Sequence, residues 1–449
     1  MIAIRTSTAL MLLALLTAGC RDLEDGQATG GTSKLGLADV SVLFPLPKDA
    51  AATGLMGLDA AGRGGPLLGA AQFAQVGILR EGDDAQAVYR GFRVVAARID
   101  PCFPDVALLK SNPSACRRQL RLVAQPLVFD ASVGTTVFDD ALHLAYELPE
   151  SEFEAFARAW VAVRTSRSSD LARPLDVHVE VQAQGLEGPV ASELRRLILA
   201  HAGPQALRRV TFMQGSFARW TFGGVELQDG EVSAAVAIHG LAADAGTQST
   251  VVPPSGVFEF APGTEDGRVL EALAGEGTDG ALFGAIDPDV TLTASPEALR
   301  EAMQRSLDID HPSKRNPDTV DCSACHVAGR ARERGKKEGL SVEGLERFEA
   351  KGFNLSIDGL GRIKARPQEQ RAFGYHLQEP VWNRRTVNES AAVAQALSDL
   401  LFGDAPGHAA RRGTPTPGAA APIRGSATIR GRRRARRFNP RARRGRAWT

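Results

Sequence analysis

The residues FRVVAARIDPCFPDVALLKSNPSACRRQLRLVAQPLVF, numbered 92–129, hold two strand-like runs on either side of a loop. FRVVAARI (92–99) and RQLRLVAQPLVF (118–129) are short and rich in apolar and β-branched residues, as strands are. Cys102 and Cys116 lie at the two ends of the loop between them. We therefore predict two neighbouring strands whose loop is closed by a structural Cys102–Cys116 disulfide, which stabilises a loop of this size by about 3 kcal/mol.

Other runs between residues 35 and 290 also have the character of strands. In LDVHVEVQA (175–183), three valines alternate with polar residues, which predicts a strand with His178 on its solvated face. The remaining runs of this kind are ADVSVLFPL (38–46), RRVTFMQ (208–214), ARWTFGGVEL (218–227) and EVSAAVAIHGL (231–241). Short runs separated by Gly and Pro predict a β-rich body over residues 35–290, which could hold two subdomains.

Two amphipathic helices interrupt this β-rich pattern. The first is expected to begin at Ser151, which can form a capping box with Glu154. The second begins at Pro189 and ends before Gly203. The apolar stripe of the first helix consists of Phe153, Phe156, Trp160 and Val163. The fold class is therefore α+β, and the body holds no nucleophile elbow, phosphate-binding loop, HExxH motif or EF-hand loop that would predict an activity.

The N-terminal residues MIAIRTSTALMLLALLTAGC have the pattern of a secretory signal: Arg5, then an apolar run, then small residues before Cys20. The run is shorter than the roughly 20 apolar residues that a transmembrane helix needs. The ending TAGC resembles the lipobox of bacterial lipoproteins. The alternative is an ordinary secretory peptide that leaves Cys20 over.

The lipobox resemblance implies that residues 1–19 are removed and that Cys20 is acylated and inserted into a lipid bilayer. An Asp after the lipidated Cys tends to retain such proteins in the inner membrane. Arg21 stands at this position, so the resemblance implies the outer membrane, with the folded part facing the periplasm or exposed at the surface. Residues 20–34 are then the flexible leash.

The net charge of +1 hides an uneven distribution, because residues 411–449 contain 13 Arg and no acidic residue, which leaves −12 for residues 1–410. The tail at 404–449 has no periodic apolar pattern and is expected to be disordered. In a cytoplasmic protein such a tail would favour nucleic acid as a partner, but behind an export signal we expect no nucleic-acid binding.

The region 291–403 carries the motif VDCSACH (320–326) within a series of predicted helices. One helix is expected from Pro296 to about Leu307, capped by Ser295. Another apparent helix is VEGLERFEAKGF (342–353). A loop FGYHLQEPVWNRR (373–385) and a final helix from Thr386 follow.

This order of elements around C-x-x-C-H resembles a small, all-α monohaem cytochrome c domain. The resemblance implies that Cys322 and Cys325 form thioethers with one covalent haem c and that His326 is the proximal iron ligand. Such haem is attached outside the cytoplasm, which agrees with the export signal. It also implies electron transfer, or redox sensing, with an unidentified redox partner protein rather than catalysis.

The distal iron ligand departs from the family pattern, because no Met follows Met303 in the chain. His376 stands where that Met would be expected, so we predict bis-His ligation by His326 and His376. Weaker choices are Met303, His311 and His408. If His376 does not bind, the iron would be five-coordinate.

Two other interpretations of Cys322, Cys325 and His326 stay open on sequence grounds. A zinc site normally spaces its ligand pairs apart and needs four ligands. A Cys322–Cys325 disulfide or redox pair suits the periplasm, but the thioredoxin-like setting is absent from the pattern. The alternative function is then a structural or interaction lipoprotein without haem.

Overall fold

The computed structural model describes residues 35–48, 54–104, 116–130, 132–137, 140–216, 219–241, 246–251, 259–261, 296–337, 339, 341–356 and 373–402. The predictions for Cys20, His408, the signal and the Arg-rich tail lie outside these residues. Within the described part of the chain, no helix is long and apolar enough to cross a membrane. The described residues through Phe402 belong to one compact unit.

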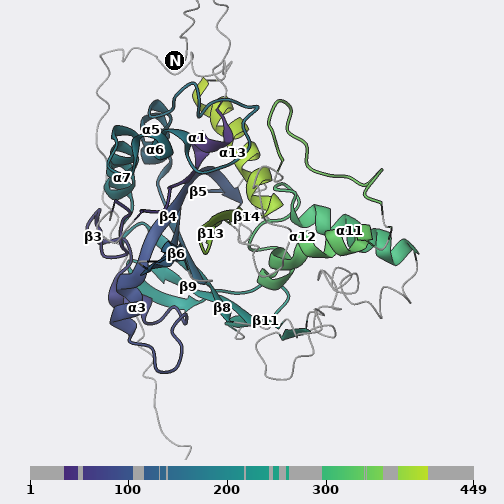
Figure 1. The fold of residues 1–449 in the computed structure, drawn as a ribbon, viewed down its shortest axis with the longest axis horizontal. Coiled ribbons are helices and arrows are strands. Elements are labelled where there is room, and N and C mark those ends of the chain that lie inside the picture. The colour runs from purple at the N-terminus through teal and green to yellow at the C-terminus, as the bar shows by residue number, and fades with distance from the viewer. Residues whose placement is uncertain are drawn as a thin grey trace, which may run out of the picture. The chain divides into compact units, whose positions relative to one another are not determined.

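An antiparallel sheet of ten strands dominates the described residues (Figure 1). Its main path runs β1-β4-β5-β7-β8-β9-β11-β12, with β6 paired to β5 and β10 paired to β9. The strands are β1 (Ser41–Leu43), β4 (Phe92–Pro104), β5 (Cys116–Asp130), β6 (Gly134–Val137), β7 (Asp140–Glu147), β8 (Leu207–Ser216), β9 (Arg219–Gln228), β10 (Glu231–Ala235), β11 (Thr247–Val251) and β12 (Glu259–Ala261). A separate short hairpin joins β2 (Ala61–Gly62) and β3 (Gly65–Pro66).

The runs 92–99 and 118–129 lie in β4 and β5 and form the predicted antiparallel pair, with Ala97 opposite Leu122 and Ile99 opposite Leu120. Cys102 and Cys116 are joined by a disulfide at the end of this pair. Both predictions are confirmed, and so is the α+β class.

Helices pack their apolar stripes against this sheet. α5 (Glu150–Ala162), α6 (Val179–Gln184) and α7 (Pro189–His201) lie together, and α11 (Pro296–Ile309) and α12 (Cys322–Lys337) lie side by side near β11 (Figure 1). The aromatic residues Phe153, Phe156 and Trp160 of α5 are buried, as their spacing predicted. The other helices are α1 (Leu37–Val40), α2 (Ala70–Phe73), α3 (Ala85–Gly91) and α13 (Arg384–Phe402).

Three local predictions in the body are wrong. The run 175–183 contains α6 instead of a strand, because His178 accepts a hydrogen bond from Val181 N at the helix N-terminus and Gly185, with φ of 82°, ends the helix. His178 is accordingly buried rather than solvated. α5 begins at Glu150 after Pro149, so Ser151 is not its cap. In the run 38–46, the residues through Val40 form a helical turn and β1 starts only at Ser41.

The C-terminal region also differs from the expected all-α domain. Residues 373–382 form a hairpin of β13 (Phe373–His376) and β14 (Glu379–Trp382). The predicted helix at 342–353 is a series of turns, in which Phe348 and Phe353 pack against the main core. α11 and α13 are helical as predicted, although each extends about two residues beyond the expected ends.

The β13-β14 hairpin packs directly against the sheet. Gln125 of β5 donates to the backbone oxygen of Tyr375 (2.9 Å) and accepts from its backbone N–H (2.7 Å). The Tyr375 hydroxyl donates to the oxygen of Phe44 at 2.7 Å. The described C-terminal residues therefore share a core with the N-terminal strands, and this packing shapes the space above the sheet.

Candidate functional site

A cavity of about 240 Å³ lies between one face of the sheet and the start of α12. Alternate residues of the central strands face it, among them His143 on β7 and Thr211 and Met213 on β8, while Leu142 and Val210 point into the main core. This alternation is the two-residue period of a strand. The opposite wall carries all three side chains of the C-x-x-C-H motif: Cys322, Cys325 and His326.

The start of α12 is held in place by two polar side chains. Asp321 Oδ1 accepts a hydrogen bond from the backbone N–H of Ala324 at 2.8 Å, which makes Asp321 the N-cap. Gln248 of β11 donates to the same carboxylate at 2.8 Å and accepts from Ser323 N at 2.9 Å. Two of the N–H groups that a helix start leaves without a helical partner are thereby satisfied. The motif is thus fixed to strand β11 of the sheet.

Cys322 and Cys325 are separate thiols that face the cavity. Burial raises the pKa of each to about 12, and the negative charge of Asp321 adds to the rise. Both retain some accessible surface, which belongs to the cavity. Reactive redox cysteines have lowered pKa values, so these neutral thiols do not have the electrostatics of a catalytic dithiol.

His326 is buried between aromatic rings of β9. Its ring centre lies 5.0 Å from that of Trp220 and 5.3 Å from that of Phe222. Burial lowers the pKa of His326 to about 4, so the ring is neutral at pH 7. Its Nε2 atom is buried without a hydrogen-bond partner. An unpartnered buried nitrogen costs free energy, and a ligand that binds it would remove this cost.

The cavity rim carries arginines that are held by carboxylates. Arg209 pairs with Glu226 at 2.7 Å and with Asp318. Arg121 pairs with Asp100 at 2.5 Å. Since carboxylates already pair with both arginines, this part of the cavity wall is polar but carries no net positive charge.

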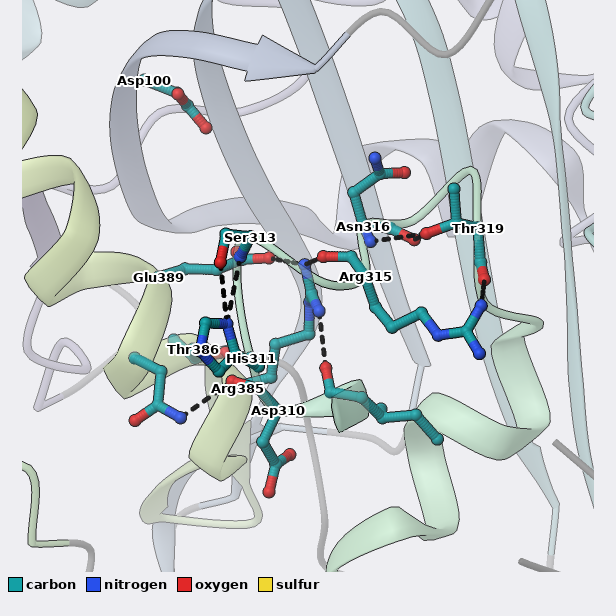
Figure 2. Close-up of polar contacts among 12 residues, drawn as sticks. Asp100, Asp310, His311, Ser313, Arg315, Asn316, Thr319, Arg385, Thr386 and Glu389 are labelled. Carbon is teal, nitrogen blue, oxygen red and sulfur yellow. Dashed lines mark hydrogen bonds and ion pairs between the residues drawn. The ribbon is translucent and has the colours of Figure 1, made fainter. Parts of the chain in front are cut away.

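Helix α13 closes the site through a buried ion cluster. Arg385, which lines the cavity, pairs with Glu389 at 2.6 Å and donates to the backbone oxygens of Ile309 and Arg315. Figure 2 shows Arg385 reaching from α13 into the loop around Asp310, His311 and Arg315. Burial alone would raise the pKa of Glu389, but Arg385, Arg98 and Arg121 outweigh it and lower this pKa to about 2. The cluster ties the loop before α12 to the sheet.

His143 lies on the sheet face below the cavity. Its pKa is lowered to about 4, first by burial and then by the positive charges of Arg121 and Arg98. It is partly accessible by surface area because it faces the cavity. It is therefore a neutral nitrogen donor at pH 7.

The proposed distal ligand His376 is placed elsewhere. His376 lies opposite Glu379 in the backbone register of the hairpin, next to its turn. The following residue, Leu377, forms an isolated backbone β-bridge with Val137. Phe373, at the other end of β13, is the residue of this strand that lines the cavity. Met303 is buried in α11, and the His311 ring lies 5.4 Å from Phe348. Neither of these two is among the residues that line the cavity.

Residues that the sequence did not single out complete the site. Trp220, Phe222 and Met213 were recognised only as members of strand-like runs, and His143 was not noticed. The alternation of Thr211 and Met213 in RRVTFMQ places both on one face, but sequence alone does not show that α12 covers that face.

Among the described residues, no three His, Cys, Asp or Glu side chains gather as metal ligands. Haem iron needs at most two protein ligands, so this finding does not test a haem site. Comparisons of the chain with protein-family models, curated proteins and solved structures gave no match.

Proposed function

We propose that this protein is a c-type haem protein that carries electrons in the bacterial cell envelope. One haem would be held covalently by Cys322 and Cys325, and His326 Nε2 would bind its iron. The observation that carries the proposal is that these three side chains face one cavity, with the His326 nitrogen buried and unpartnered.

The residues of the cavity fit such a group in chemistry. Cys322 and Cys325 supply two thiols one helical turn apart, which can reach two vinyl edges. Apolar side chains such as Phe222, Val320 and Phe373 supply the surface against which a porphyrin packs. When bound, the haem would supply a one-electron couple, and the chain's part is to hold it and set its electrostatics.

The chain's own residues would orient the iron ligand and limit the access of water. Trp220 and Phe222 hold the His326 ring from the sheet side, and Asp321 with Gln248 fixes the helix that carries it. Burial keeps the imidazole neutral, which is the form that binds a metal ion.

The test of the haem is an absorption spectrum, oxidised and dithionite-reduced, of the protein expressed with a haem-attachment system. We expect a cytochrome c spectrum and haem that stays on the chain after denaturation. The variant Cys322→Ala/Cys325→Ala should lose it, whereas the matched control Cys102→Ala/Cys116→Ala should keep it. If the parent protein is colourless although the attachment machinery works, the haem proposal is wrong. The alternative function, a structural or interaction lipoprotein without haem, would then be favoured.

We also propose that Cys20 is acylated and anchors the protein to the outer membrane, with the folded part in the periplasm. The lipobox-like ending of residues 17–20 supports this. In cell fractionation, the parent should sediment with outer membranes and Cys20→Ser should not. Equal distribution of the two proteins would count against acylation.

A further inference from the structure

The wall opposite His326 determines which second side chain could reach the iron. His326 enters the cavity from α12, and the facing wall is formed by the sheet. Two axial ligands bind iron from opposite faces of one porphyrin, so the second ligand must lie close to His326 across the cavity. This argument rests on the proposed function, because it assumes a haem held by Cys322 and Cys325.

Two side chains of the sheet carry an iron-binding atom into the described cavity lining. These are the thioether of Met213 on β8 and the imidazole of His143 on β7. Both are uncharged at neutral pH, and both come from strands that precede the motif by more than a hundred residues. The register of the sheet shows which of the two residues lies nearer to β9, the strand that contacts His326.

Met213 lies beside the aromatic residues that hold His326. It is directly opposite Phe222 in the β8-β9 pair, and Phe222 packs on the His326 ring at 5.3 Å. Residues directly opposite each other on antiparallel strands have Cβ atoms about 5 Å apart. Met213 is 7 % exposed, and its unbranched side chain can adapt its position.

His143 lies farther than Met213 from β9, the strand whose aromatic rings contact His326. It lies on β7, two strands from β9, and it is opposite Thr211, which is two residues along β8 from Met213. Two strand spacings amount to about 10 Å. His376, at the turn end of the β13-β14 hairpin, is not among the residues that line the cavity.

We propose that Met213, from the sheet, is the distal iron ligand of a His326/Met213 haem centre. The haem would then join two parts of the chain that the sequence separates, the β8 strand and the α12 helix. A Met/His pair raises the reduction potential relative to a bis-His pair, so the protein would work at a higher potential than the predicted His376 ligation implies.

The test compares Met213→Leu, His143→Gln and His376→Gln with the parent, each expressed with a haem-attachment system. Covalent haem is first measured after denaturation. The ferric spectrum is then examined for the charge-transfer band of a thioether–iron bond, and the midpoint potential is measured by redox titration. Met213→Leu conserves side-chain volume, which keeps the destabilisation below about 1.5 kcal/mol.

We expect all three variants to retain covalent haem, and only Met213→Leu to lose the thioether band. Met213→His should shift the potential downward, because a second imidazole stabilises ferric iron. If Met213→Leu leaves spectrum and potential unchanged while His143→Gln or His376→Gln alters them, Met213 is not the ligand. Absence of haem from the parent would instead overturn the proposed function, which separates the two failures.

Discussion

Arg98 of β4 donates a hydrogen bond to the carboxylate of Glu389 on α13, 291 residues further along the chain. Arg98 also donates to Ser41 on β1 and to the backbone oxygen of Thr386. One buried guanidinium therefore connects the first strand, the second strand of the sheet and the last helix. Because Arg385 shares the same carboxylate and lines the cavity, this cluster links the sheet to the candidate site.

We expect Glu389→Gln to destabilise the protein by about 3–5 kcal/mol, because it leaves Arg98 and Arg385 buried without their carboxylate. Denaturant unfolding of the two proteins measures the difference. The control is Glu301→Gln, which removes an exposed ion pair with Arg305 and should cost less than about 1 kcal/mol. Similar losses for both variants would show that burial of the cluster contributes little.

The same carboxylate predicts an acid-sensitive contribution to stability. The pKa of Glu389 is lowered from 4.5 to about 2, despite burial, by its arginines. A group with a lowered folded-state pKa stabilises the protein fully above its unfolded pKa and loses this contribution as pH falls through the folded one. The stability difference between the parent and Glu389→Gln should therefore be constant above about pH 4.5 and shrink toward pH 2. A difference that stays the same over this range would contradict the assignment.

We expect the buried His326 to lower the stability of the haem-free protein, although the same side chain would bind the haem iron. In protein made without haem, His326→Leu should raise the free energy of unfolding by about 1–3 kcal/mol, because the unpartnered Nε2 is removed. The control His201→Leu removes a ring that is bonded to Glu152 at 3.1 Å, so it should not stabilise. In haem-loaded protein, His326→Leu should keep the covalent haem but change its spectrum. Destabilisation of the haem-free variant would mean that His326 is an ordinary core residue.

The Cys102–Cys116 disulfide predicts a stability loss that is independent of the site. It closes a separation of 14 residues, for which the chain-entropy model gives about 3 kcal/mol. Cys102→Ala/Cys116→Ala should unfold at correspondingly lower denaturant concentration. Reductant should lower the midpoint of the parent toward that of the variant and leave the variant unchanged. An effect of reductant on the variant would point to other cysteines.

The strand pair, α5, α7 and the disulfide could be predicted because their signals are local. Apolar periodicity, turn residues and cysteine spacing all lie within about forty residues of chain. α6 could not be predicted in this way, because the alternation of three valines was overridden by the His178 cap and by Gly185. The hairpin at 373–382 also lacked a turn signal, since its turn holds Leu377 with φ of 54° instead of a glycine.

Of the candidate site, only the residues of the C-x-x-C-H motif were predicted from the sequence. Cys322, Cys325 and His326 are adjacent in sequence, and the structure brings all three to one cavity. The sheet wall depends on the pairing of β7 with β8 and on the docking of α12 onto β11, which join distant segments. His376 was chosen by its distance along the chain, and this distance says nothing about which face of a hairpin a residue occupies.

Substitutions of Asp321 measure how far the orientation of the C-x-x-C-H motif depends on the N-cap of α12. Asp321→Ala removes the acceptor for Ala324 N and leaves the Gln248 amide without this partner, so it should cost about 1–3 kcal/mol in denaturant unfolding. Asp321→Asn keeps an oxygen acceptor at the cap and should cost less. If the cap orients α12, Asp321→Ala should also carry less covalent haem per chain than Asp321→Asn under the same expression conditions. Equal haem content with unequal stability would limit Asp321 to a structural role, because the motif would then reach the haem without its cap.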